Sequence, residues 1–267
     1  MIQAKETNLE ELAKELRFLI IDSIARSGSG HIGGSLSCVE ILLSLYANVI
    51  KHDPANPHWE LRDRFIMSKG HAEAVYYGTL HLSGYIPKEW LLTMRKFGSP
   101  LQGHPDPNWL DVINFAGGSL GQGLSFAAGQ AIHGKKVGFR TFALLGDGEL
   151  QEGQIWEAAI FAPRYKLDNL FAFVDCNGYQ LEGSTLGTAN LVDMERAWEG
   201  LGWNVRIIDG HDFGEICSAC VKVEGKPTLI LAKTIKGKGI SFMEHNNDFH
   251  GRGLTAEEIE SAYRELS

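Results

Sequence analysis

Four short runs rich in β-branched and aromatic residues alternate with helical patterns in the second half of this 267-residue chain. The runs cover residues 139–146, 169–175, 203–209 and 227–234, and helical patterns over about 152–163, 190–201 and 212–224 lie between them. Three of the runs are almost continuous in apolar residues, as strands buried on both faces are. This order predicts an α/β fold, in which a parallel sheet carries helices on both faces.

The rest of the chain is compatible with one domain spanning residues 1–267. Helical patterns are expected upstream at about 8–27, 36–49 and 72–83, and residues 235–253 are expected to form a functional loop. Apolar residues make up 44% and charged residues 22%, which excludes a disordered or collagen-like chain. No repeat or low-complexity linker divides the sequence.

Charge and segment lengths exclude several classes of protein. With 25 basic and 33 acidic residues the net charge is −8, which argues against a dedicated nucleic-acid or anionic-membrane binder. No apolar run is long enough to span a membrane, and the N-terminus has no leader pattern, so a cytoplasmic protein is expected. Cys217 and Cys220 form a lone C-x-x-C, which favours two small packing residues over a metal or redox role.

Glycine-containing loops run repeatedly into predicted helices. They lie at residues 27–37, 68–74, 115–125 and 144–153. Free N–H groups and the partial positive charge at helix N-termini suit phosphate, so several such loops favour an anionic ligand over ordinary turns. The loop at 144–153 follows a buried strand, where ligands bind in open parallel sheets.

Two polar residues follow successive predicted strands. Asp147 ends one and Asn177 ends the next, and the carboxyl ends of neighbouring parallel strands lie side by side. A carboxylate, an amide oxygen and the carbonyl of Tyr179 would suit Mg²⁺ or Ca²⁺. Asp and Asn are also common turn formers, and spacing alone leaves the two interpretations equal.

The same residues carry a family resemblance. GDGELQEGQIWEAA followed by VDCNGY resembles the thiamin-diphosphate motif, and SGHIGGSLS, SKGHA, LQGHPD and GGSLGQG resemble the loops of transketolase. The closing segment AKTIKGKGISFMEHNNDFHG is also similar to that family. The resemblance runs in order from about residue 9 to 255. Deoxyxylulose-phosphate synthases usually lack the residue that stands here as Glu152, and decarboxylating dehydrogenase α-subunits lack the histidine loops.

The resemblance implies thiamin diphosphate with a divalent metal, Mg²⁺ or else Ca²⁺ or Mn²⁺. Asp147, Asn177 and the carbonyl of Tyr179 would hold the metal. Gly148 would approach the diphosphate, and Gly118 and Leu120 would contact the aminopyrimidine through their backbones. The remaining implied residues are His31, His71, His104 and His250 around the cofactor and donor hydroxyls, Gln180 and Lys236 as further cofactor contacts, and Glu152 at a subunit contact.

Histidine suits such a site because its pKa lies near neutrality, so the ring can donate to and accept from sugar hydroxyls. Other histidines match no motif and are expected at the surface or in packing; they are His52, His58, His81, His133 and His211. His245 is left open between the two interpretations.

The chain departs from the family around residues 111–117. Asn114 stands in a stretch where the family usually carries a charge, which affects the expected dimer contacts and substrate preference. Ile32 replaces a common proline after the first histidine, and this variation carries little information.

Transketolases contain three α/β domains, and this chain resembles only the first. The pyrimidine-binding domain would supply the glutamate that activates the cofactor. The chain begins at Met1 and stops at Ser267, so we expect the N-terminal subunit of a split enzyme, acting as an α2β2 heterotetramer with a second chain that carries the other two domains. The expected reaction transfers a two-carbon ketol unit from a ketose phosphate to an aldose phosphate. The alternatives are a sulfonated or branched sugar as substrate, or a non-catalytic cofactor-binding protein.

Overall fold

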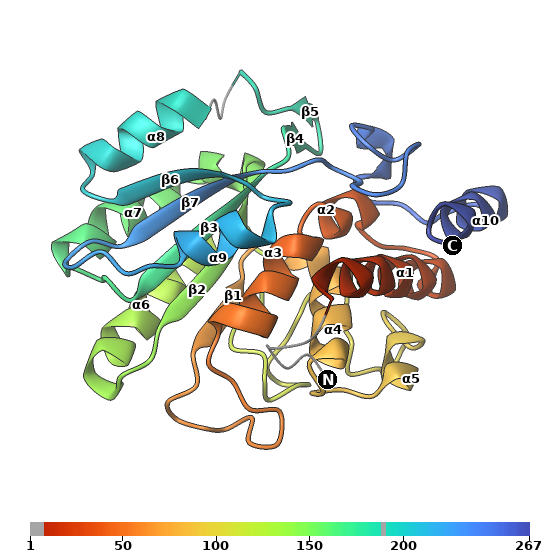
Figure 1. Ribbon diagram of the computed structural model, residues 1–267, viewed down its shortest axis with the longest axis horizontal. Coiled ribbons are helices and arrows are strands. Elements are labelled where there is room, and N and C mark those ends of the chain that lie inside the picture. The colour runs from red at the N-terminus through yellow and green to blue at the C-terminus, as the bar shows by residue number, and fades with distance from the viewer. Residues whose placement is uncertain (1–7, 188–190) are drawn as a thin grey trace.

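A parallel sheet forms the centre of the computed structural model, which describes residues 8–187 and 191–267. Its strands are β1 (Arg64–Met67), β2 (Thr141–Gly146), β3 (Leu170–Cys176), β6 (Asn204–Asp209) and β7 (Thr228–Lys233). They pair in the order β1-β2-β3-β7-β6, and every pairing is parallel (Figure 1). A small antiparallel hairpin, β4 (Tyr179–Gln180) and β5 (Gly183–Ser184), follows β3. The α/β expectation is confirmed.

The helices largely follow the predicted pattern. They are α1 (Leu9–Ser27), α2 (Ile32–Leu36), α3 (Val39–Ser44), α4 (Glu73–Leu82), α5 (Lys88–Leu91), α6 (Gln122–Val137), α7 (Gly153–Arg164), α8 (Leu191–Gly200), α9 (Phe213–Ala219) and α10 (Ala256–Glu265). Residue 190, where one predicted helix begins, lies outside the described residues.

Two predicted helices differ from those observed. The helix expected over 36–49 is divided into α3 and a π-helical turn over residues 45–49. The helix expected over 212–224 ends at Ala219, because the chain then reverses in a turn where Gly225 has φ 72° and Val223 pairs with Lys226.

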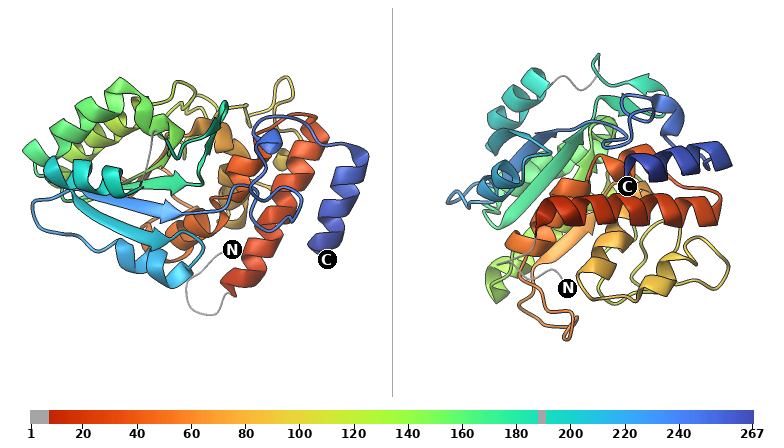
Figure 2. Two further views of the ribbon diagram at one scale, coloured as in Figure 1. Left: turned by 90° about the horizontal axis from the view of Figure 1, so that it is seen from above. Right: turned by 45° about the vertical axis from the view of Figure 1, so that its right-hand side comes forward.

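Alternate side chains of the central strands serve two separate cores, one on each face of the sheet. Phe142 and Leu144 pack with buried residues of α1, α3, α4 and α9, whereas Ala143 and Leu145 pack with those of α6, α7 and α8. Figure 2 shows these helix layers on opposite sides of the sheet. The period-2 alternation with both faces apolar explains why the strands read as continuous hydrophobic runs.

Several elements were not anticipated from sequence; they include α5, the β4–β5 hairpin, β1 and α10. The short strand β1 extends the sheet beside β2. Helix α10 packs on α1 through the stacked rings of Phe18 and Tyr263, whose centroids lie 4.9 Å apart. A capping box at its start, between Thr255 and Glu258, was the available signal.

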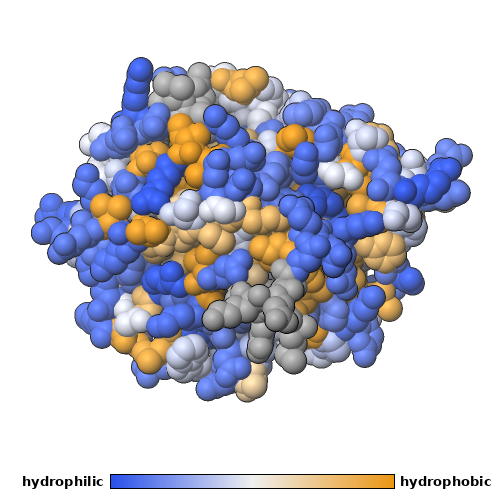
Figure 3. Space-filling model, viewed as in Figure 1, coloured by the Kyte–Doolittle hydropathy of each residue, from blue (hydrophilic) through white to orange (hydrophobic). Residues whose placement is uncertain are grey.

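The surface and cysteines add little chemistry. Hydrophilic and apolar residues are interspersed on the face shown in Figure 3. Among the described residues, no helix is both long and apolar enough to cross a bilayer. Cys217 and Cys220 are free thiols, and Cys220 is buried at the end of α9 with its Sγ 3.4 Å from the Ile216 carbonyl oxygen, as a packing residue would be.

Candidate active site

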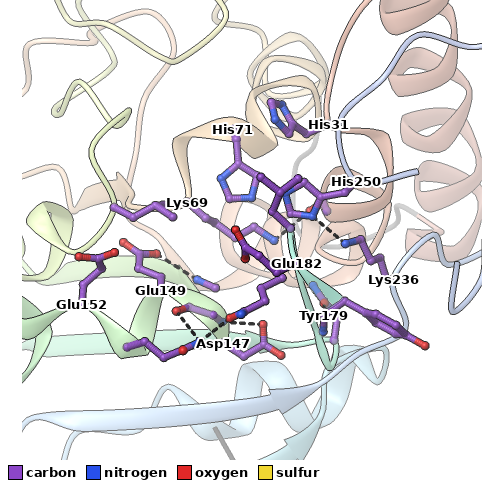
Figure 4. Close-up of a pocket in the computed structure, with 18 of the residues that line it drawn as sticks. His31, Lys69, His71, Asp147, Glu149, Glu152, Tyr179, Glu182, Lys236 and His250 are labelled. Carbon is purple, nitrogen blue, oxygen red and sulfur yellow. Dashed lines mark hydrogen bonds between the residues drawn. The ribbon is translucent and has the colours of Figure 1, made fainter. Parts of the chain in front are cut away.

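A cavity of about 450 Å³ opens at the carboxyl ends of β2 and β3. Every residue that the sequence assigned to a site lines it; these residues are His31, His71, His104, Gly118, Leu120, Asp147, Gly148, Glu152, Asn177, Tyr179, Gln180, Lys236 and His250. Figure 4 shows His31, His71 and His250 grouped at one side of the cavity and Asp147 at the other. The structure therefore brings the predicted residues together, and their individual roles stay predictions.

Asp147 lies at the end of β2, held in one orientation by neighbouring donors. Its Oδ2 accepts from the Gly178 N–H and the Thr185 hydroxyl, each at 2.8 Å, and its Oδ1 accepts from the Gly148 N–H at 2.9 Å. Burial, together with the charge of Asp175, raises the pKa of Asp147. Because the negative charge of this buried carboxylate is disfavoured, a bound cation would stabilise it.

The side-chain amide of Asn177 is oriented by a buried carboxylate behind it. Its Nδ2 donates to Asp175 Oδ2 at 2.8 Å, while its Oδ1 accepts from the Tyr179 N–H at 3.1 Å. Because ionised Asp175 only accepts hydrogen bonds, Asn177 must turn its nitrogen toward it and its oxygen away. Together with Asp147, this oxygen forms a hard donor set of the kind that Mg²⁺ prefers, so the residues fit a divalent metal.

A fully buried ion pair supports these ligands, and the sequence analysis missed it. Lys69 and Asp175 form a salt bridge, and Asp175 also accepts from the hydroxyls of Ser37 and Thr234. Burial alone would raise the pKa of Asp175, but the Lys69 ammonium and these donors hold it at about 2. We call Lys69, Asp175 and Asn177 the cavity floor. The sequence signal for this ion pair was the charged residue Asp175 at the end of the apolar run FAFVD.

Glu149 is a second buried carboxylate that sequence reasoning missed. Its Oε1 accepts from the Ser68 hydroxyl at 2.5 Å and the Gly121 N–H at 2.8 Å, and its Oε2 accepts from the Gly146 N–H at 3.1 Å. These bonds join three of the glycine-containing loops at one carboxylate. Burial raises its pKa. Glu149 thereby fixes the spacing of the loops that line the cavity.

Four histidines, which we call the histidine rim, surround the opening; they are His31, His71, His104 and His250. The ring centroids of His31 and His71 are 5.1 Å apart, and His250 lies 5.8 Å from each. Burial, with nearby cations, lowers the pKa of all four, to about 4 for His31 and His250. The rim is therefore neutral at physiological pH.

Lys236 links the C-terminal loop to the rim. Its Nζ donates to Asn247 Oδ1 at 2.7 Å and to His250 Nδ1 at 2.8 Å. Burial, with the charge of Lys69, lowers its pKa to about 8. Because Lys236 carries no acceptor, His250 Nδ1 accepts and the proton of the ring lies on Nε2.

At two glycines of these loops, a side chain would collide with a neighbouring segment. A Cβ on Gly70 would lie 1.4 Å from the Gly117 carbonyl oxygen, and a Cβ on Gly148 would lie 2.8 Å from Cβ of Gln180. At Gly118 there is room, since its nearest neighbour would be the His104 ring at 3.7 Å. Packing therefore explains the first two glycines without a ligand, while Gly118 leaves its exposed backbone open to one.

The remaining sequence candidates fall on the periphery. Glu152 is exposed at the start of α7 and lines the cavity. Asn114 lies outside the cavity wall and accepts from Arg62 Nη2 at 2.9 Å. His245 is exposed on the C-terminal loop, and His211 joins Glu40 to the Ile235 N–H at 2.9 Å each, as a packing residue.

Comparisons with known proteins agree with this geometry. Residues 9–267 match the family described as transketolase, thiamine diphosphate binding domain. The chain is 42% identical over 267 residues to the 6-deoxy-6-sulfo-D-fructose transketolase subunit SqwG of Clostridium sp. (strain MSTE9), covering 98% of this chain and 97% of that one. It is 39% identical over 264 residues to an apulose-4-phosphate transketolase subunit of Phocaeicola vulgatus, covering 97% and 94%.

A solved structure shows the same fold. The transketolase from Campylobacter jejuni superposes with a TM-score of 0.90 at 38% identity, covering 97% of this chain and 42% of that chain. This chain therefore spans less than half the length of that relative, although it spans nearly all of the two subunits.

Proposed function

This chain belongs to the transketolase family, and we propose that it is the diphosphate-binding subunit of a two-chain transketolase. The assembled enzyme would transfer a two-carbon ketol unit from a ketose phosphate to an aldose phosphate. The observation that carries the proposal is the convergence of the predicted metal ligands, glycine loops and histidines on one cavity at the carboxyl ends of β2 and β3.

The oxygen donors at the carboxyl ends of β2 and β3 fit the cofactor's metal and diphosphate. Asp147, Asn177 and the carbonyl of Tyr179 would hold Mg²⁺, and Gly148 and Gln180 lie beside them where the diphosphate would approach. Glu152, Gly118, Leu120 and Lys236 complete the assigned cofactor contacts. When bound, thiamine diphosphate supplies the electron sink that allows a carbon–carbon bond next to a carbonyl to break.

The histidine rim would handle the sugar. Neutral rings each carry one donor and one acceptor, so they can bind hydroxyl groups and hold or release protons without a charge in the ground state. The rings of His31, His71 and His250 contact one another, so one sugar molecule could contact all three. His104 extends the rim over Gly118.

A partner chain would supply the domains that this chain does not span. Apolar side chains are exposed along α6 and α7, including Ile160 (60% exposed), and Tyr165 (51%) is exposed directly after α7. A groove of about 260 Å³ lies between these helices, lined by Ser125, Ala128, Gly129, Glu157, Ala158 and Phe161. Such a surface suits association with another chain. We propose an α2β2 assembly in the cytoplasm.

The experiment is affinity purification of the tagged chain from native extract, followed by assay of the recovered material. We expect a stoichiometric partner of about two domains' mass and ketol transfer that requires thiamine diphosphate and Mg²⁺. A chain recovered alone that binds the cofactor tightly would instead support a non-catalytic binding protein and contradict the proposal.

A second substrate class is favoured by one observation. The relative that is 42% identical is named for a sulfonated ketose. A donor panel of ketose phosphates, 6-sulfonated ketoses and branched sugar phosphates, assayed on the purified complex, separates these alternatives. Turnover of xylulose phosphate alone would exclude the sulfonated and branched substrates.

A further inference from the structure

A buried carboxylate and an arginine lie directly behind His31, and neither belongs to the cavity wall. Glu73, at the start of α4, has a fully buried side chain. Its Oε1 accepts from Arg95 Nε at 2.8 Å and pairs with Arg95 Nη2 at 2.8 Å. The same Nη2 lies 3.2 Å from His31 Nδ1. The cavity is lined by His31, whereas Glu73 and Arg95 are absent from its described lining.

The direction of the contact follows from chemistry. Arginine stays protonated and has only donors, so Arg95 Nη2 donates and His31 Nδ1 must accept. The single proton of the neutral ring then lies on Nε2. A second proton on Nδ1 would face the guanidinium, and burial together with this cation lowers the pKa of His31 to about 4.

The backbone at Arg95 gives an independent sign of constraint. Arg95 has φ 62°, in the left-handed region that non-glycine residues rarely occupy. The turn is closed by the Arg95 N–H, which donates to the Leu101 carbonyl oxygen at 2.8 Å, and Nη2 lies 3.4 Å from the Gly103 carbonyl oxygen. A strained backbone conformation of this kind persists only where the surrounding structure holds the residue in it, and such residues cluster at functional sites.

Glu73 is the second unusual group. Its Oε2 is buried without a hydrogen-bond partner in the described structure. Burial raises the pKa of Glu73 to about 7, although Arg95 opposes the shift. A buried, half-satisfied carboxylate adds little to folding stability by itself. Its contact with Arg95 instead holds the guanidinium in place.

We propose that Glu73 and Arg95 are positioning residues that hold His31 as its Nε2–H tautomer, so that the ring presents a donor, and not an acceptor, to the ligand in the cavity. The inference deepens the proposed function and rests on it for the meaning of that donor. The donor would serve an oxygen of the sugar or of the diphosphate, both of which accept hydrogen bonds. Other groups that contact the His31 ring or lie near it are His71, His104, His250 and Lys69. None of these forms the contact with Nδ1 that Arg95 forms.

The test is side-chain ¹⁵N NMR of the full 267-residue chain. The ring signals of His31 are assigned as those that disappear in the His31→Gln variant. In the unaltered chain we expect the Nε2–H tautomer to dominate between pH 6 and 8. Dominance of the Nδ1–H tautomer would overturn the proposal without any variant. This readout needs neither a partner nor turnover, so its failure is distinct from failure of ketol transfer.

Variants then test which residues set the tautomer. Arg95→Met should give a mixture of tautomers and raise the midpoint of His31 titration by about one pH unit, because the facing cation is removed. Glu73→Leu should also mix the tautomers, while Glu73→Gln, which keeps an acceptor for Arg95, should retain Nε2–H. Arg26→Met is the matched control, since Arg26 pairs with Asp22 on the outer face of α1.

Activity of the assembled enzyme gives the functional readout. Arg95→Met and Glu73→Leu should each lower kcat about tenfold, as loss of orientation at a reacting group does. Glu73→Gln should restore most of it. An Nε2–H tautomer that persists in both Arg95→Met and Glu73→Leu would overturn the positioning role, whatever the activity.

Discussion

The cavity floor and the histidine rim differ in how their polar side chains are satisfied. On the floor, Asp175 accepts hydrogen bonds from Lys69, Ser37, Thr234 and Asn177, and its side chain is fully buried. On the rim, the rings of His31, His71 and His250 contact one another and open into the cavity. The charges of the floor are paired with each other and hydrogen-bonded within the protein. The rim is neutral, and its ring nitrogens can form hydrogen bonds to a ligand. In the proposed enzyme the floor would orient a metal ligand, and the rim would exchange protons with the sugar.

The largest expected effect comes from breaking the floor. Asp175→Ala leaves the Lys69 ammonium buried without its partner, so the free energy of unfolding should fall by about 3–5 kcal/mol. Chemical denaturation monitored by circular dichroism measures it. Asp22→Ala, which removes the partner of the exposed Arg26 and the acceptor of the Tyr263 hydroxyl, should cost much less.

A double variant distinguishes loss of charge balance from loss of packing. Lys69→Met combined with Asp175→Leu removes both charges and should recover much of the lost stability. Equal destabilisation by the single and double variants would show that shape, and not the ion pair, maintains the floor.

The next effect concerns the ligand more than the fold. Asp147→Asn keeps the shape of the side chain but removes the charge that would bind the metal and replaces one of the two oxygens that accept backbone N–H groups. We expect affinity for thiamine diphosphate with Mg²⁺ in the assembled enzyme to fall at least about 100-fold, measured by isothermal titration calorimetry. Asp53→Asn, at an exposed carboxylate that accepts from the Ala55 N–H at 2.9 Å, is the control. Unchanged affinity in Asp147→Asn would show that the metal site is misassigned.

Sequence alone predicted the parts of the fold with strong local signals. Strands β2, β3 and β7 are buried on both faces, so each reads as one apolar run. The four-residue strand β1 is too short to show a pattern, and helix α10 was missed although a capping box marks its start. The helix predicted over 212–224 extended too far, because a helical pattern does not reveal where a turn such as that at Gly225 interrupts it.

The candidate site divides in the same way. Residues within recognisable loops, such as Asp147 and His71, were found because their neighbours in sequence identify them. The supporting pairs were missed because their partners are remote: Lys69 and Asp175 lie 106 residues apart, and Arg95 and His31 lie 64 apart. Only the packed fold brings such residues together, and no periodicity marks them in advance.

A pH experiment separates the rim from the floor. The pKa of His250 is about 4 in the folded chain, owing to burial and Lys236, against about 6.5 when unfolded. Between these values the unfolded chain binds a proton that the folded chain does not, so the free energy of unfolding falls as pH falls.

Glutamine cannot be protonated, so His250→Gln lacks this dependence. The stability of the unaltered chain relative to His250→Gln should decline by about 1 kcal/mol from pH 7.5 to pH 5, allowing for the partial exposure of the ring. Denaturation of both proteins at each pH measures the difference. A difference that is constant across this range would contradict a lowered pKa for His250.

Two glycines give contrasting expectations, and the smallest effect on stability is expected at the second of them, Gly118. Gly70→Ala would place a methyl group against the Gly117 carbonyl, at a distance that forces the loops apart, and should destabilise the chain by about 3 kcal/mol. Gly118→Ala meets only the His104 ring at ordinary contact distance and should change the free energy of unfolding by less than about 0.5 kcal/mol. Its effect should fall on the ligand instead, as weaker binding of thiamine diphosphate to the assembled enzyme, because Gly118 is exposed in the cavity wall. If Gly118→Ala bound the cofactor normally, the cavity would have room for a methyl group at this position and the close approach assigned to this glycine would be wrong, while the packing contrast between Gly70 and Gly118 would stand.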